Sequence, residues 1–212
     1  HPDNDAIKTS LDRGLQRSLE TLLADRTAKQ GRSLTGAILV ADHQSGDILA
    51  SVGSADFFDT KRQGFVDMTR AVRSPGSTLK PLIYGLAFDA GLAHPETLIQ
   101  DQPTDFGGYV PTNFDRVYHG TVSVRKALQL SLNIPPVLLT QELGPARLMA
   151  TLRAGGADPQ VPGGKPGLAV ALGGVGLSLN ELVQLYASLA NGGTGVPLLW
   201  QQGANTADQT HQ

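Results

Sequence analysis

The sequence predicts an α+β protein in which an antiparallel sheet carries a helix and is followed by a mainly helical part. Three observations lead to this prediction. Leucines recur at helical spacing over residues 13–29, which indicates an amphipathic helix. Two apolar runs, 36–41 and 48–52, flank the polar turn 43–47 and are typical of a β-hairpin. From residue 77 onward, apolar residues recur at helical spacing.

Local signals justify the elements of the first third. Residues 7–11 resemble a short strand, and Asp12 is a suitable N-cap for the helix that follows. The apolar face of that helix consists of Leu15, Leu19, Leu22 and Leu23. Residues 53–72 have no clear periodicity, so we expect a loop.

Turn residues divide the rest of the chain. Pro-Gly before Ser77 indicates a turn that opens a helix, and a long ordered loop is expected where Pro, Gly, Asp and Asn cluster. Ser178 and Glu181 form the pattern of a capping box. The expected elements are a helix over 77–91, a loop over 93–120, a helix capped by Thr121 that ends at 131–133, a helix from Pro135 to Gly144, a helix over 145–154, a loop over 155–168, a helix from Ser178 to 191–193, and a polar tail over 201–212.

Composition excludes several classes of protein. The chain has 212 residues, 40% of them hydrophobic and 17% charged, with a formal net charge of −2, which is typical of a globular protein without a nucleic-acid-binding surface. It has no cysteine, so disulfides and a cysteine nucleophile are excluded. No apolar run reaches the length of about 18 residues that a membrane span requires. The chain begins with His1 and Pro2, and we expect a piece of a longer protein.

The segment 73–81, RSPGSTLKP, holds the strongest candidate for chemistry. A serine hydroxyl is a weak nucleophile near pH 7 and needs a group that takes its proton. Lys80 follows Ser77 by three residues, so on a helix the two side chains share a face. A lysine acts as a base only when it is neutral, and burial lowers its pKa toward that state. We therefore expect Lys80 to be buried beside Ser77.

The motif alone is ambiguous, because about one copy of S-x-x-K is expected by chance in a chain of this size. A second copy runs from Ser123 to Lys126, and the partner motif S-x-N also occurs twice, at 131–133 and 178–180. Lys126 stands beside Arg125 and is well explained as a solvated cation, whereas an apolar helix follows Lys80. Ser178 is already explained as a cap. The residues thus favour Ser77 and Lys80, with Ser131 and Asn133, over the alternative set.

These motifs belong to a wider resemblance. S-x-x-K and S-x-N occur together in penicillin-binding proteins and serine β-lactamases. Residues from about 7 to 193 resemble the transpeptidase domain of a class A penicillin-binding protein of the 1C type, including segments 9–20, 73–91, 106–115, 127–133, 172–176 and 189–193. The resemblance implies a serine β-lactamase/transpeptidase-like fold, with an antiparallel sheet flanked by helices, an all-helical subdomain, and an incomplete sheet. It implies one partial domain over 1–197, divided near residue 72 into a strand and helix part and a helical part 73–197, with a polar tail over 198–212.

The resemblance also implies roles for the four residues. Ser77 would be the acylated nucleophile, with its backbone N–H in the oxyanion hole, and Lys80 its general base. Ser131 would relay the proton to the leaving group, and Asn133 would bind the substrate backbone. The substrate would be the D-Ala-D-Ala end of a peptidoglycan stem peptide, in a D,D-transpeptidase or carboxypeptidase reaction, and β-lactams would trap Ser77. No metal or organic cofactor would be needed.

One motif of the family is not found. The third motif, Lys-Thr-Gly, has no close variant here, because Lys165 is followed by Pro166 and this segment precedes the last predicted helix. In the family that motif lies on a strand after the helix that here ends at 191–193, so we expect a truncated domain. The parent protein would also carry a glycosyltransferase domain and a membrane anchor, lie at the periplasmic face of the bacterial inner membrane, and act with other cell-wall synthesis proteins.

Two further functions compete with the acyltransferase. A non-catalytic penicillin sensor or degenerate scaffold would keep the fold without turnover, although the intact set Ser77, Lys80, Ser131 and Asn133 argues against it. A class A or D β-lactamase fits poorly, since the loop around 109–111 resembles the biosynthetic branch. A P-loop kinase is excluded, because no G-x-x-x-x-G-K-[ST] segment occurs.

Overall fold

The fold is a computed structural model that describes residues 8–31 and 34–201. Within these residues, none of the helices combines the length and the apolar character needed to cross a membrane. The chain divides into two compact units, here called unit 1 and unit 2. Unit 1 comprises His1–Val72, Gly155–Ala157 and Ser178–Gln212, and unit 2 comprises Arg73–Ala154 and Asp158–Leu177.

Unit 1 is built on the predicted helix and hairpin, and both are confirmed. Helix α1 spans Arg13–Gln30 and begins after Asp12, whose side chain accepts a hydrogen bond from the Leu15 backbone N–H at 2.8 Å. Strand β1, Ile38–Ala41, pairs antiparallel with β2, Ile48–Val52. The Asp12 side chain satisfies one of the free N–H groups in the first turn of α1, which explains why this helix starts at Arg13.

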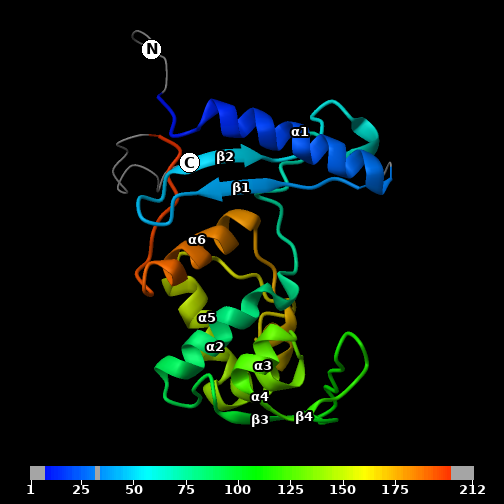
Figure 1. Cartoon of the computed structure of the whole chain (residues 1–212), viewed down its shortest axis with the longest axis vertical. Helices are drawn as coiled ribbons and strands as arrows, with labels where there is room; N and C mark the ends of the chain where they lie inside the picture. The colour runs from blue at the N-terminus through cyan, green and yellow to red at the C-terminus, as the bar shows by residue number, and fades with distance from the viewer. Residues whose placement is uncertain (1–7, 32–33, 202–212) are drawn as a thin grey trace. The chain divides into compact units, whose positions relative to one another are not determined.

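Helices cover both faces of this hairpin (Figure 1). Helix α1 contacts β2, and helix α6, Leu179–Ala190, contacts β1. The capping box predicted for Ser178 and Glu181 is confirmed at the start of α6. The sequence grouped this helix with the helical part, 73–197, whereas its contacts place it in unit 1. The alternating buried residues of β2 are Ile48, Ala50 and Val52.

The ends of unit 1 differ from the prediction. Of the predicted strand 7–11, Ile7 lies outside the described residues, and Thr9 makes a single bridge to Gln201 rather than a strand. Within the expected loop 53–72, a short 3-10 turn, η1, spans Thr60–Arg62. The predicted polar tail lies outside the described residues from position 202 onward.

Unit 2 packs around helix α4, Ile134–Leu143, in which seven of ten residues are buried. Helix α4 contacts α2, Lys80–Asp89, and α5, Pro145–Ala154. It also contacts the 3-10 turn η3, Leu168–Leu172, which lies within a segment that the sequence left without structure. A helix with so many buried apolar residues belongs in the middle of a core, where no polar face is needed.

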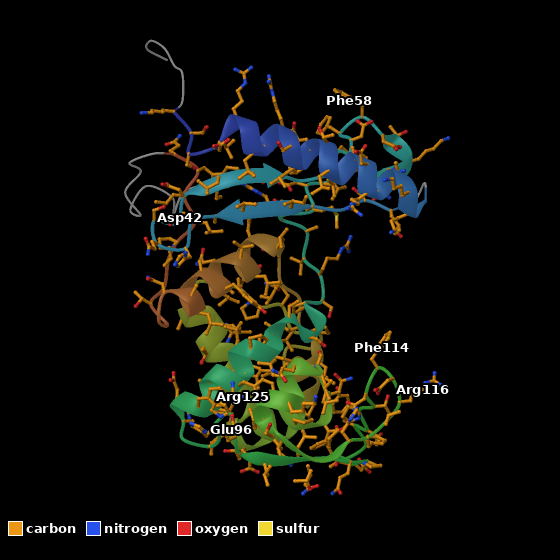
Figure 2. The ribbon with its side chains drawn as sticks, viewed as in Figure 1. Asp42, Phe58, Glu96, Phe114, Arg116 and Arg125 are labelled. Carbon is orange, nitrogen blue, oxygen red and sulfur yellow. The ribbon has the colours of Figure 1, made fainter. Side chains whose placement is uncertain are left out.

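The predicted loop 93–120 is partly wrong, because its two ends pair as strands. Strand β3, Leu98–Asp101, pairs antiparallel with β4, Gly120–Ser123, and Asp101 lies opposite Gly120. The part predicted to be all helical therefore also contains strands. Between them, the loop 102–119 projects with Phe114 and Arg116 at its outer end (Figure 2).

Helix α3, Val124–Gln129, follows β4 directly. Its N-cap is Ser123, whose hydroxyl accepts from the Lys126 backbone N–H at 3.3 Å, so the prediction of Thr121 as the cap is wrong. Thr121 lies in the strand instead, because pairing with β3 continues as far as Ser123.

Candidate active site

Ser77 lies in a 3-10 turn that leads directly into helix α2. The turn, η2, spans Gly76–Leu79, and α2 begins at Lys80. Gly76 has a φ of 55°, and a Cβ on Gly173 would lie 2.4 Å from the Gly76 nitrogen. A side chain at either position would therefore disturb the turn before Ser77. Ser77 is exposed, so its hydroxyl is accessible from solvent.

Lys80 is almost completely buried, with 1% of its surface exposed. Its Nζ is hydrogen-bonded to the backbone oxygen of Ser131 at 2.6 Å, to Ser131 Oγ at 3.1 Å and to Asn133 Oδ1 at 2.7 Å. Burial lowers the pKa of Lys80 from 10.5 to about 8. In the described structure it forms no hydrogen bond with Ser77 Oγ. A lysine in this environment exchanges its proton close to neutral pH, which a solvated lysine does not.

Ser131 and Asn133 lie in the short connection between α3 and α4. Ser131 has a φ of 52°, a left-handed conformation that is uncommon for residues other than glycine and that turns its carbonyl oxygen toward Lys80. Asn133 is held from two sides. Its Nδ2 donates to the Thr112 oxygen at 2.7 Å, and its backbone N–H donates to Asn113 Oδ1 at 2.8 Å. The Asn133 amide oxygen is thereby directed at Lys80.

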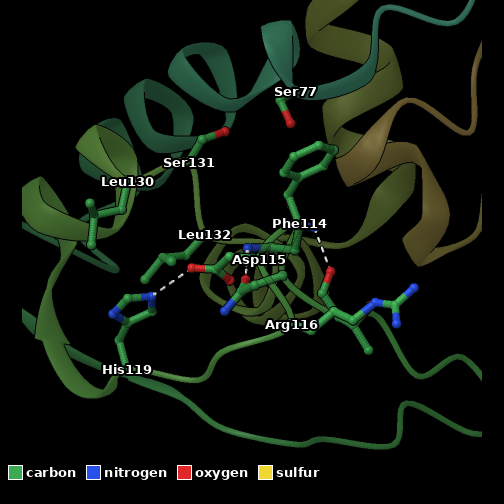
Figure 3. Close-up of a pocket in the computed structure, with 11 residues that line it drawn as sticks. Ser77, Phe114, Asp115, Arg116, His119, Leu130, Ser131 and Leu132 are labelled. Atoms are coloured by element: carbon green, nitrogen blue, oxygen red, sulfur yellow. Dashed lines mark hydrogen bonds and ion pairs between the residues drawn. The ribbon is translucent and has the colours of Figure 1, made fainter.

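A cavity of about 680 Å³ opens in front of these residues. Figure 3 shows the hydroxyls of Ser77 and Ser131 on one side of the cavity, with the ring of Phe114 directed toward Ser77. Phe114 is fully exposed. The cavity therefore combines a hydroxyl nucleophile candidate with an apolar surface. Its lining residues are Ser77, Thr112, Asn113, Phe114, Asp115, Arg116, His119, Leu130, Ser131, Leu132 and Asn133.

An acidic and an imidazole side chain face each other across part of this cavity. His119 Nε2 lies 3.5 Å from Asp115 Oδ2 (Figure 3). The backbone N–H of Val117, which donates to Asp115 Oδ1 at 3.0 Å, is the main cause that holds the pKa of Asp115 below its ordinary value. Asp115 therefore contributes a carboxylate to a cavity that Arg116 and His119 also line.

The second S-x-x-K segment has a different environment. The Ser123 hydroxyl caps helix α3, and Lys126 is exposed. The neighbouring Arg125 is paired with Glu96 at 2.7 Å on the surface of unit 2 (Figure 2). In the described structure no packing removes this lysine from water.

The second S-x-N segment lies in unit 1. The Ser178 hydroxyl accepts from the Glu181 backbone N–H and donates to the Glu181 carboxylate at 2.6 Å. Asn180 Oδ1 is buried without a hydrogen-bond partner among the described residues. The Ser178 hydroxyl is therefore already engaged in capping helix α6.

The structure thus brings the preferred set together. Lys80 contacts Ser131 and Asn133, and Ser77 lines the same cavity as both. The sequence predicted a long ordered loop over 93–120 and a family resemblance over 106–115, but it assigned no role to individual side chains there. The signal that could have found them is the density of hydrogen-bonding and aromatic residues. Residues missed by the sequence are Thr112, Asn113, Phe114, Asp115, Arg116, His119, Leu130 and Leu132.

Across residues 8–31 and 34–201, no three His, Asp or Glu side chains are grouped so that they could hold a metal ion. The site itself contains two hydroxyls, an amine of lowered pKa and two side-chain amides.

Comparisons with known proteins point to one family. Residues 36–211 match the family model described as penicillin binding protein transpeptidase domain. The chain is 43% identical to penicillin-binding protein 1C of Escherichia coli over 191 residues, which is 90% of this chain and 25% of that protein. It is 33% identical to penicillin-binding protein 1F of Bacillus subtilis over 193 residues, 89% of this chain and 26% of that protein. The chain spans about a quarter of the length of these relatives.

The fold has a counterpart among solved structures. PonA1 of Mycobacterium tuberculosis, solved in complex with penicillin V, superposes with a TM-score of 0.80 at 24% identity, over 93% of this chain and 54% of that one. This likeness confirms the predicted transpeptidase-like α+β fold. Together with the family match over most of the sequence, it confirms the resemblance inferred from the motifs. The chain belongs to the penicillin-binding protein transpeptidase domain family.

Proposed function

We propose that this chain is the acyl-transfer part of a peptidoglycan D,D-transpeptidase, in which Ser77 is the nucleophile, Lys80 the general base, Ser131 the proton relay and Asn133 the ligand of the substrate backbone. The observation that supports it most is the burial of the Lys80 amine among Ser131 and Asn133, with a pKa lowered to about 8. A base is most effective when its pKa lies near the working pH.

The contacts of Lys80 suit a neutral amine. The Ser131 carbonyl and the Asn133 amide oxygen only accept hydrogen bonds, so they use the two N–H groups of a neutral amine. The Ser131 hydroxyl can either accept from the nitrogen or donate to its lone pair. The same three contacts therefore serve both protonation states, and a proton can move through Ser131 without rearrangement of the other two.

The proposed reaction has two balanced steps. Ser77 Oγ bonds to the carbonyl carbon of the penultimate D-alanine while its proton passes to Lys80. The tetrahedral intermediate then breaks its C–N bond, Ser131 delivers that proton to the nitrogen, and the terminal D-alanine leaves. In the second step an amine of a neighbouring stem peptide bonds to the acyl carbon, the bond between that carbon and Ser77 Oγ breaks, and the proton of the amine passes to Ser77 Oγ. Attack by water instead would give the carboxypeptidase product.

The wider setting is part of the same proposal. Peptidoglycan stem peptides lie outside the cytoplasm, so the enzyme would act at the extracytoplasmic face of the inner membrane. The family resemblance supports a longer parent protein that also carries a glycosyltransferase, and β-lactams would act as substrate mimics that acylate Ser77. This assignment extends the family membership to a specific chemistry, which the labelling experiment below tests.

The test is covalent labelling. The 212-residue chain, and a form extended past Gln212, would be incubated with a fluorescent penicillin and the adduct located by peptide mass spectrometry. We expect the label on Ser77, its absence in Ser77→Ala and its near absence in Lys80→Ala. Ser123→Ala, which alters the second S-x-x-K serine, is the matched control and should keep the label.

Two results would contradict the proposal. An adduct on Ser123, or equal labelling of Ser77→Ala and the unaltered chain, would remove the site assignment. Labelling of Ser77 without any transfer to an amine acceptor in the extended form would favour the penicillin sensor over the transpeptidase.

A further inference from the structure

The carboxylate of Asp101 is completely buried, with 0% of its surface exposed. It lies at the end of β3 and has no Lys, Arg or His side chain as an ion-pair partner in the described part of the chain. Its hydrogen bonds come instead from the His119 backbone N–H at 2.8 Å and from Asn113 Nδ2 at 2.8 and 3.1 Å. Burying an unpaired carboxylate costs several kcal/mol, so a residue kept in this position needs an explanation.

The hydrogen bonds of Asp101 fix the orientation of Asn113. The carboxylate and the Val117 oxygen, which Asn113 Nδ2 also contacts at 2.8 Å, only accept hydrogen bonds. The NH2 group of Asn113 must therefore face them, and its oxygen must face the other way. There it accepts the Asn133 backbone N–H at 2.8 Å.

The chain of contacts continues to the lysine. Asn133 Nδ2 donates to the oxygen of Thr112, the residue next to Asn113 in the same loop, at 2.7 Å. This contact directs Asn133 Oδ1 to Lys80 Nζ, also at 2.7 Å. Asn113, which Asp101 orients, holds the backbone N–H of Asn133, and the Thr112 oxygen sets the orientation of the Asn133 side-chain amide, so Asp101 acts on the amine by fixing the position of Asn133.

We infer that Asp101 is a positioning residue of the acyl-transfer site. It acts through Asn113 to hold Asn133, and with it the Lys80 amine, in place beside the cavity. Asp101 does not line the cavity and is not a catalytic residue in this scheme. The inference rests on the proposed function, because it assumes that Lys80 and Asn133 serve the acylation of Ser77. Outer residues that orient the groups contacting a reactive centre commonly affect the reaction without touching it.

The isosteric variant Asp101→Asn tests the inference. In this variant the His119 backbone N–H holds the remaining oxygen at the Oδ2 position, so the new NH2 group takes the place of Oδ1 beside Asn113 Nδ2, and two donors oppose each other. In the form that labels, we expect the acylation rate constant for a fluorescent penicillin to fall about tenfold or more, and the dissociation constant of the noncovalent complex, to which Asn133 contributes in this scheme, to rise by a smaller factor. Asp105→Asn is the matched control, since Asp105 lies in the loop 102–119 that follows Asp101, is exposed, and among the described residues accepts from Gly108 N–H only.

A double variant that exchanges the carboxylate at position 101 and the amide at position 113 provides the second measurement. In the double variant Asp101→Asn, Asn113→Asp, the carboxylate at 113 can accept from both the amide at 101 and the Asn133 N–H. We expect this variant to recover at least a third of the lost acylation rate, although the contact with the Val117 oxygen is sacrificed. A residue that served only folding would not show rescue of the rate constant when acceptor and donor are exchanged between the two positions.

The outcomes separate this inference from the proposed function. If the unaltered protein is not labelled on Ser77, the proposed function fails. If it is labelled and Asp101→Asn acylates at the same rate, the positioning role alone fails. If Asp101→Asn does not fold, the double variant decides: a folded double variant that acylates supports the role, and one that does not acylate, or does not fold, overturns it.

Discussion

The four-residue pattern S-x-x-K occurs twice in unit 2, and its two copies have different environments in the structure. Ser77 is exposed with a free hydroxyl in the described structure, and Lys80 is 1% exposed. Ser123 has its hydroxyl bonded to the start of helix α3, and Lys126 is exposed. Spacing is equal in both copies, so spacing cannot produce the difference. What differs is where each helix directs its lysine.

The direction follows from the residues around each motif. Helix α2 buries Lys80 together with Ile83, Tyr84 and Ala87, while α3 buries only Val124 and Ala127. A long lysine side chain in a buried face loses its water and gives up its proton more readily. A reactive amine is thus a property of the packing behind the motif, and the following predictions test that difference.

The largest effect is expected for removal of the two lysines. Lys80→Ala should lower the second-order rate constant of labelling by a fluorescent penicillin about 10³-fold, within the range that general base catalysis supplies. Lys126→Ala should leave it unchanged within twofold. Stopped-flow or quench measurements on both variants give the numbers. Equal losses would mean that the two copies are functionally alike.

A second difference concerns stability against pH. The pKa of Lys80 is lowered on folding, so the unfolded chain binds more protons than the folded one between about pH 8 and 10.5, and the free energy of unfolding increases with pH across this window. Between pH 7.5 and 9.5 the increase should be about 2 kcal/mol by urea unfolding. This range ends below pH 10, the ordinary pKa of tyrosine, so tyrosine ionisation in the unfolded chain is partial and opposes only part of the increase.

The two lysine variants show which amine causes the increase in the free energy of unfolding. Lys80→Ala should remove it, and Lys126→Ala should retain it. A flat profile in the unaltered chain would mean that the Lys80 amine keeps its ordinary proton affinity, and the base assignment would lose its physical support.

The third prediction uses the same pKa in kinetics. With a pKa of about 8, the neutral fraction of Lys80 rises about tenfold from pH 7 to pH 9, so the acylation rate constant should rise about tenfold as well. The increase should be present in Lys126→Ala. A rate that falls over this range would show that the reaction needs the charged amine.

Much of the fold could be predicted because its signals are local. The Asp12 cap, the hairpin around residues 43–47 and the capping box at Ser178 are each encoded within a few neighbouring residues, and all three appear in the structure. Strands β3 and β4 were missed. Each has only four residues, and their pairing depends on contacts across the intervening loop 102–119 that no local pattern reports.

The site residues also fall into those that local motifs predict and those that no local motif predicts. Ser77, Lys80, Ser131 and Asn133 could be named because motifs carry them and because an apolar helix follows Lys80. The parts beyond the motifs could not be. The contact of Asn113 with Asn133 joins residues 20 apart, and the left-handed backbone of Ser131 results from tertiary contacts that hold a residue in a conformation it does not prefer.

The smallest changes in stability are expected for the two serines, and here the serine that affects stability is not the one that affects labelling. Ser123→Ala removes a helix cap and should lower the free energy of unfolding by about 1 kcal/mol while labelling continues at its normal rate. Ser77→Ala removes an exposed hydroxyl with no hydrogen bond in the described structure, so stability should change by less than about 0.5 kcal/mol while labelling is lost. Urea unfolding and adduct mapping on both variants measure the two properties separately. If Ser77→Ala were instead the more destabilising change, its hydroxyl would be part of the fold, and the division between a structural and a reactive serine would have to be abandoned.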